Sequence, residues 1–133
     1  MNAIYVTMSS PNHLVHLPVE ISGEDKGCAL FEIRGQVRPY VDLDLYFCVD
    51  FIEDSCIGPK MMPILRRITL QPDSTRGGGT IDQTFDKMLW LSCNRSRIKE
   101  LRTYISDASG NFPPFVDCHI TCTLVIIPRF GYK

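Results

Sequence analysis

A stretch of strict alternation at residues 40–51 most constrains what this chain can fold into. Its apolar side chains recur at every second position, and tyrosine, cysteine and aspartate fill the positions between them. Successive side chains of a β-strand point to opposite faces, so this pattern predicts a strand with one buried and one solvated face. Such a strand would be about 40 Å long, and we expect it to bend at a bulge or to cross between two sheets.

Four further segments show the same period of two. Residues 116–127 alternate between apolar and polar side chains, and their far end is apolar on both faces, which predicts that this end is covered. Residues 13–21 and 28–38 predict two strands joined by a hairpin-type loop, and residues 3–8 predict an edge strand. Gly35, inside one of these strands, indicates a bulge or a close backbone approach. In residues 28–38 and 116–127, the side chains expected to point inward include Phe31, Ile33, Val37, Val116 and Cys118.

The middle of the chain shows a helical period instead. Thr80 and Gln83 have the spacing of a capping box, and the apolar residues that follow, from Ile81 to Leu89, fall on one helical face. A second helix is predicted from Ser96 to Gly110, with an apolar face formed by Ile98, Leu101 and Ile105. The predicted fold is therefore α+β: a mainly antiparallel β-sheet or sandwich of about five strands with two central helices.

Length and composition favour one domain, residues 1–133. The chain has 133 residues, 44% of them hydrophobic, and a net charge of −1, which does not suit a disordered protein. It contains neither an apolar run long enough to span a membrane nor the pattern of a signal peptide. The six cysteines form no C-x-x-C pair, so we expect reduced thiols in a cytoplasmic, intracellular protein without a metal or other cofactor.

Charge divides unevenly along the chain. Residues 1–60 carry a net charge of −5 and residues 61–133 carry +4. On the long predicted strand the solvated face would present Asp42, Asp44 and Asp50. On the second predicted helix a basic face would be formed by Arg95, Arg97, Lys99 and Arg102. Such faces can complement each other between copies, although solvated surface charge explains them equally well.

Two smaller features are candidate binding sites. The loop formed by Arg76, Gly77, Gly78 and Gly79 precedes the first predicted helix, and a glycine-rich loop at a helix N-terminus can bind an anion. An exposed connector explains the same loop, since no lysine or P-loop motif accompanies it. Phe130 and Tyr132, near the end of the chain, would either dock onto a neighbouring molecule or cover the chain's own core.

Catalytic signals are sparse. His13 and His16 are three apart on a predicted strand, so they point to opposite faces and do not form a metal-ligand pair. Cys118 and His119 are adjacent and face opposite ways for the same reason. An enzyme built around His16, His119 or a cysteine is the least favoured of three hypotheses.

The favoured hypothesis is a non-enzymatic structural protein that assembles with itself or with another protein. Its acidic strand face would meet the basic helix of a neighbour. The compact chain, its uneven charge and its aromatic tail suggest, by association and not by a resemblance of residues, a self-assembling protein such as a small viral matrix or capsid component. The alternative is an intracellular anion-binding adaptor, whose basic helix engages nucleic acid or an anionic membrane surface.

Overall fold

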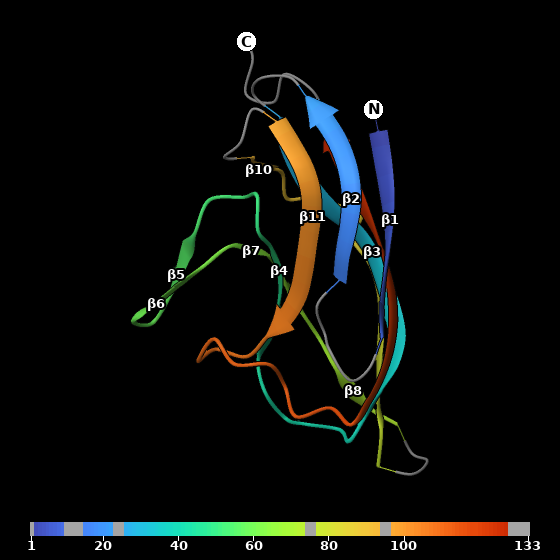
Figure 1. Ribbon diagram of the computed structural model, residues 1–133. Helices are drawn as coiled ribbons and strands as arrows, with labels where there is room; N and C mark the ends of the chain where they lie inside the picture. The colour runs from blue at the N-terminus through green and yellow to red at the C-terminus, as the bar shows by residue number, and fades with distance from the viewer. Residues whose placement is uncertain (1, 10–14, 23–25, 74–76, 94–96, 128–133) are drawn as a thin grey trace.

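The computed structural model describes residues 2–9, 15–22, 26–73, 77–93 and 97–127. Every regular element in these residues is a β-strand, so the predicted α+β class with two central helices is wrong (Figure 1). With no helix in this part of the chain, none is long and apolar enough to cross a membrane.

Ten of the strands form two main sheets (Figure 1). The first, sheet A, has the order β1 (Asn2–Ser9), β12 (Asp117–Ile127), β3 (Gly27–Arg38), β9 (Gly79–Thr84) and β8 (Gln71–Pro72), with β10 (Leu91–Ser92) also paired to β3. The second, sheet B, has the order β2 (Val15–Ser22), β11 (Arg97–Ser106), β4 (Leu45–Val49) and β7 (Ile64–Ile68). A separate hairpin, β5 (Ser55–Ile57) and β6 (Lys60–Met62), lies in the connection between β4 and β7.

The eight principal strands pair in a nested way. The first strand, β1, pairs with the last, β12; β2 pairs with β11, β3 with β9, and β4 with β7. All of these pairs are antiparallel, so the chain resembles one long hairpin that has been rolled up into two facing sheets. This topology is a jelly roll, a double sheet of eight strands.

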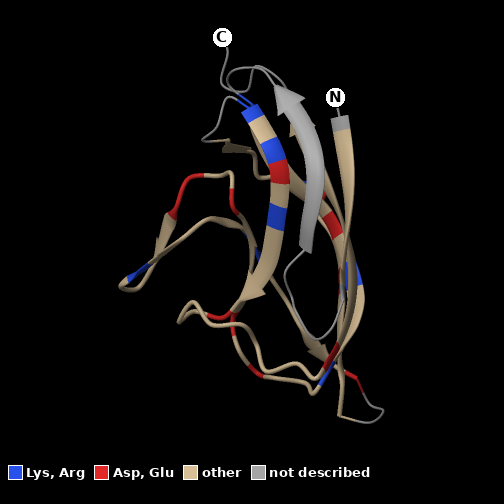
Figure 2. Cartoon of the chain, in the orientation of Figure 1, with Lys and Arg blue, Asp and Glu red and all other residues tan. Residues whose placement is uncertain are grey.

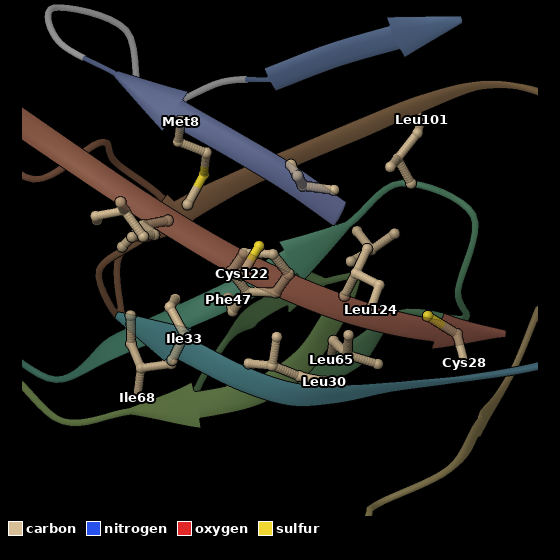
Figure 3. Packing of buried hydrophobic residues seen from close by; sticks show 14 of the residues in the cluster. Met8, Cys28, Leu30, Ile33, Phe47, Leu65, Ile68, Leu101, Cys122 and Leu124 are labelled. Atoms are coloured by element: carbon tan, nitrogen blue, oxygen red, sulfur yellow. The ribbon is translucent and has the colours of Figure 1, made fainter. Parts of the chain in front are cut away.

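The core lies between the two sheets. Figure 3 shows Met8, Ile33 and Cys122 of sheet A packed toward Phe47 and Leu65 of sheet B. Along β12 the buried positions alternate as expected, and the buried Val125 on the opposite face confirms that the far end of this strand is covered.

The second predicted helix is the strand β11. A bulge between Ile98 and Glu100 separates Ile98 from the next inward residue, Leu101, by three positions instead of two. Thr103 takes the next inward position, and its hydroxyl has no hydrogen-bond partner among the described residues. A bulge and one polar core residue together thus gave a strand the apolar spacing of a helix.

The first predicted helix is replaced mainly by the strand β9. Ile81 and Phe85 are buried, as a helical face would also require, but Gln83 lies between them at the alternate position of a strand. The Gln83 side-chain Oε1 accepts a 2.7 Å hydrogen bond from the backbone N–H of Thr69. The Thr80–Gln83 spacing is therefore not a capping box.

The long predicted strand at residues 40–51 is strand only at Leu45–Val49. Leu45, Phe47 and Val49 point into the core as expected, whereas Leu43 is exposed. The preceding residues form the connection from β3 in sheet A to β4 in sheet B, so the segment does cross between sheets.

The other expected strands are present as β1, β2, β3 and β12, and the expected edge strand β1 does end its sheet. Two inward assignments are wrong. Phe31 is exposed, because the irregularity in the β3–β12 pairing falls at this residue. Val116 is exposed because it precedes β12.

The β4–β7 connection covers part of the outer face of sheet B. Cys48 and Ser106 point away from the core cluster but are both fully buried. The Ser106 Oγ lies 3.4 Å from the Met62 sulfur at the base of the β5–β6 hairpin and 2.8 Å from the backbone oxygen of Asp107. The hairpin itself projects to the side of the sandwich (Figure 1).

Gly35 is required by the close approach of β3 and β12. A Cβ atom on Gly35 would meet the backbone oxygen of His119 and lie 2.7 Å from the Cα of Ile120. Backbone atoms cannot turn aside as a flexible side chain can, so the close approach anticipated at Gly35 is confirmed.

We expect Gly35→Ala to lower the free energy of unfolding by about 2 kcal/mol or more, because the two central strands of sheet A must move apart. The measurement is urea unfolding followed by tryptophan fluorescence. The adjacent exposed residue gives the control: Gln36→Ala should change stability by less than about 0.5 kcal/mol. Equal effects of the two substitutions would contradict this account of the β3–β12 contact.

Candidate functional site

The strands at the ends of the two sheets differ in how well they are protected. An end strand exposes unpaired backbone N–H and C=O groups, and proteins block such edges with short length, proline, charge or a covering segment. At one end of sheet A, β8 and β10 have two residues each, and β8 contains Pro72. In sheet B, the end strand β2 contains Pro18, which has no N–H to donate.

The other end of sheet B, β7, is charged and covered. It carries Arg66 and Arg67. The Arg66 guanidinium lies 3.8 Å from the centroid of the Phe85 ring and donates a 2.9 Å hydrogen bond to the backbone oxygen of Lys87. The chain after β9 therefore lies against this strand.

In the part of the chain that the structure describes, the remaining end strand, β1, shows none of these protections. Its eight residues, Asn2–Ser9, include no charged residue and no proline. All eight pair with β12 on one side, and no described strand pairs with the other side, which we call the β1 edge. Tyr5, at the middle of the strand, has 74% of its surface exposed, and Ala3 and Thr7 are exposed on the same face.

The surface beside β1 is polar and already paired. Arg34 on β3 makes a 2.9 Å ion pair with Asp82 and a 3.4 Å ion pair with Glu32. A shallow cavity of about 230 Å³ separates this group from β1, with Tyr5 and Thr7 on its far side. This charged group, whose members pair with one another, lies beyond β12 on the side of β1 opposite the β1 edge, so it does not bring charge to that edge.

The acidic residues singled out from the sequence do not form one face. Asp42 and Asp44 precede β4, and Asp50 follows it. Asp44 makes a 2.7 Å ion pair with Arg67 of the same chain. An Asp50 carboxylate oxygen accepts a 3.3 Å hydrogen bond from the backbone N–H of Arg102, so this aspartate lies beside the basic segment instead of opposing it from another molecule.

The basic residues lie on a strand. Arg97, Lys99 and Arg102 are exposed on β11, and Figure 2 shows them along the front of sheet B with Glu100 among them. The bulge that follows Ile98 leaves both Lys99 and Glu100 exposed. Arg95 lies outside the described residues.

The glycine-rich loop does not lead into a helix. Gly79 begins β9, and the backbone oxygens of Gly77 and Gly78 accept hydrogen bonds of 2.7 and 2.8 Å from the N–H groups of Tyr40 and Asp73. Gly78 and Gly79 line a cavity of about 420 Å³, together with Asp73, Asp117, Arg38 and His119. The helix dipole that would favour an anion is missing, and two of the lining residues are acidic. Three residues singled out with these features lie outside the described part of the chain: Arg76, Phe130 and Tyr132.

Sequence analysis identified the strand of the candidate site but not its importance. The signal was present: residues 3–8 are the one predicted strand that lacks both charge and proline. The candidate sites predicted from charge lie on other elements.

The thiols are mostly buried and held in the protonated form. All six cysteines are free, and only Cys56 is exposed. Burial raises the pKa of Cys48 and of Cys122 to about 12 and that of Cys93 to about 11. Cys118 is buried while His119 faces solvent, so they lie on opposite faces of β12 as expected.

We expect one fast-reacting thiol when the folded protein is treated with a thiol reagent at about pH 8.5. Cys56 should react first, because the other thiols are buried or held protonated. Cys93 should follow slowly and accelerate as the pH approaches 11, the pKa that burial gives it. Cys56→Ser should remove the fast phase; a fast phase that survives this substitution would show that another thiol is accessible.

The raised pKa values of the buried thiols also make the stability of the folded protein depend on pH in the alkaline range. The unfolded chain releases these protons first, so the stability from buried thiols is complete below about pH 8.5 and is lost as the pH rises toward 12.

Comparisons with known proteins assign no family. No family model matches the chain, and no curated protein matches it. Jelly rolls occur in viral capsid domains, lectins and cupins, so topology by itself favours no one role. Among the described residues, no group of three or more His, Cys, Asp or Glu is arranged to hold a metal ion.

Proposed function

We propose that this chain is a non-enzymatic jelly-roll protein that works by associating with itself through the β1 edge. The observation that carries the proposal is the contrast among the end strands. In the described structure β8, β10, β2 and β7 are short, interrupted by proline, charged or covered, and β1 is none of these. A long, uncharged and uncovered edge is a template for pairing with another strand.

Pairing at the β1 edge satisfies backbone groups that otherwise depend on water. It also covers Tyr5, whose exposed ring is the largest apolar group on this strand. This mode of association needs no complementary charge. Asp44 and Asp50, two of the three acids that a charge-driven assembly would use, already have partners within the chain.

The proposal includes a cytoplasmic location. Six free thiols support it, because disulfides persist mainly in oxidising compartments.

We expect the mass in solution to rise with protein concentration from 15.1 kDa toward twice that value. Because the contact is uncharged, the rise should persist from about 50 to about 500 mM salt. Tyr5→Lys combined with Thr7→Lys should weaken association at least about tenfold, since lysines on an edge strand oppose pairing. Sedimentation over a concentration series measures both effects.

The matched control is Gln36→Lys combined with Gln71→Lys, which adds the same charge at exposed positions of the same sheet away from β1. It should associate as the unaltered chain does. A chain that stays monomeric at every concentration, or a β1 variant that associates normally, would contradict the proposal.

A second candidate function is recognition of an anionic partner, nucleic acid or a membrane surface, by the basic residues of β11. The exposed Arg97, Lys99 and Arg102 on one strand favour it (Figure 2). Glu100 within the group and the overall charge of −1 weaken the attraction.

If this second function holds, binding to a single-stranded oligonucleotide or to vesicles with anionic lipid should weaken steeply with salt. Lys99→Glu combined with Arg102→Glu should lower binding to the oligonucleotide and reduce the salt slope by about two, one for each lost contact. Lys60→Glu combined with Lys87→Glu is the charge-matched control, because both lysines are exposed and lie away from β11. Equal losses in the two variants would show a general charge effect instead of a site.

A further inference from the structure

We propose that two copies of this chain pair their β1 strands antiparallel about a two-fold axis that passes midway between Tyr5 of one copy and Tyr5 of the other. This inference rests on the proposed function and adds to it the geometry of the contact. When two copies associate through the same strand, the interface is isologous and has two-fold symmetry. Residue i of the first copy then contacts residue j of the second, and residue j of the first contacts residue i of the second. Two identical strands related in this way run antiparallel.

The sequence of β1 allows this self-pairing without an electrostatic cost. Like charges opposite each other destabilise a strand pair, and Asn2–Ser9 contains no charge that could meet its own copy. A self-pairing of β7 would bring Arg66 and Arg67 of one copy close to the same arginines of the other.

Backbone geometry limits the register to two choices. In an antiparallel sheet every second residue turns its N–H and C=O toward the same neighbour. Because β12 occupies one side of β1, residues of a single parity face the open edge, and they must meet residues of the same parity. One residue of β1 must therefore lie directly opposite its own copy. Only Tyr5 or Val6 in this position leaves a single residue of β1 unpaired.

Exposure favours the axis at Tyr5. Val6 is only 1% exposed and packs in the core, so placing it opposite its copy would bury almost no further apolar surface. Tyr5, in contrast, is 74% exposed. An axis at Tyr5 places the two tyrosine rings opposite each other on the outer face and Ala3 opposite Thr7. Cross-strand aromatic pairs are among the more stabilising contacts in a sheet. An axis at Val6 would place Tyr5 opposite Thr7 and leave the rings apart.

The contact would join two sheets into one. Sheet A of each copy ends at β1, so the order β8, β9, β3, β12, β1 would continue directly into β1 and β12 of the second copy. The β5–β6 hairpin lies on the other side of the sandwich, where it does not obstruct the pairing (Figure 1).

Disulfide trapping tests the register. Directly opposed residues in an antiparallel pair have Cα atoms about 4.5–5.5 Å apart, which suits a disulfide. All variants carry Cys56→Ser, because Cys56 is the exposed native thiol, and the parent with this change alone should form no cross-link. Under mild oxidation we expect Tyr5→Cys to cross-link with itself, and Ala3→Cys to cross-link with Thr7→Cys when the two are mixed. Ala3→Cys alone and Thr7→Cys alone should remain uncross-linked.

The Ala3–Thr7 mixture keeps the tyrosine in place, so it tests the register even if Tyr5→Cys weakens the dimer. Cross-linking of Tyr5→Cys with Thr7→Cys in its place would move the axis to Val6 and overturn the inference. If the unaltered chain dimerises through β1 but neither expected pair cross-links, the register is wrong while the proposed function stands. If the unaltered chain is monomeric, both fail.

Discussion

The double pairing of β12 holds the fold together. This strand lies between β1 and β3, and both of its ladders run for most of its length. Within the second ladder, Gly35 lets the two backbones approach at His119 and Ile120 more closely than any side chain would allow. β12 also buries Cys118, Ile120, Cys122, Leu124 and Ile126. The first strand of the chain thus has no described partner except the last, and its other edge depends on what the surroundings provide.

Much of the β-structure could be predicted from alternation, and the errors have a common physical cause. The segments that became β1, β3 and β12 show the pattern because nearly every inward position is apolar. The two false helices came from strands with one polar residue at an inward position: Gln83, which bonds the backbone of Thr69, and Thr103, which is buried without a described partner. Each removed one apolar residue from a period of two, and the irregularity in the β2–β11 pairing completed the resemblance to a period near four.

The candidate site was harder to foresee than the fold, because an edge is a property of topology. A strand without charge can as well be central and covered, and only the strand order shows that β1 ends its sheet. Charge patterns pointed elsewhere, since a sequence does not reveal which ions are neutralised inside the chain. Asp44 with Arg67, and Arg34 with Asp82, are separated widely in sequence and joined only by the fold.

The β5–β6 hairpin occupies the turn of the rolled-up chain, where the innermost pair, β4 and β7, is joined. Met62 at its base is fixed under Ser106, but the bend at Gly58, with a φ of 55°, meets no other atoms within 4 Å of where a side chain would begin. Closing a longer loop costs little more than closing a short one. Chain can therefore be added at this tip without shifting any strand register, which makes it the natural position to display a foreign peptide on this scaffold.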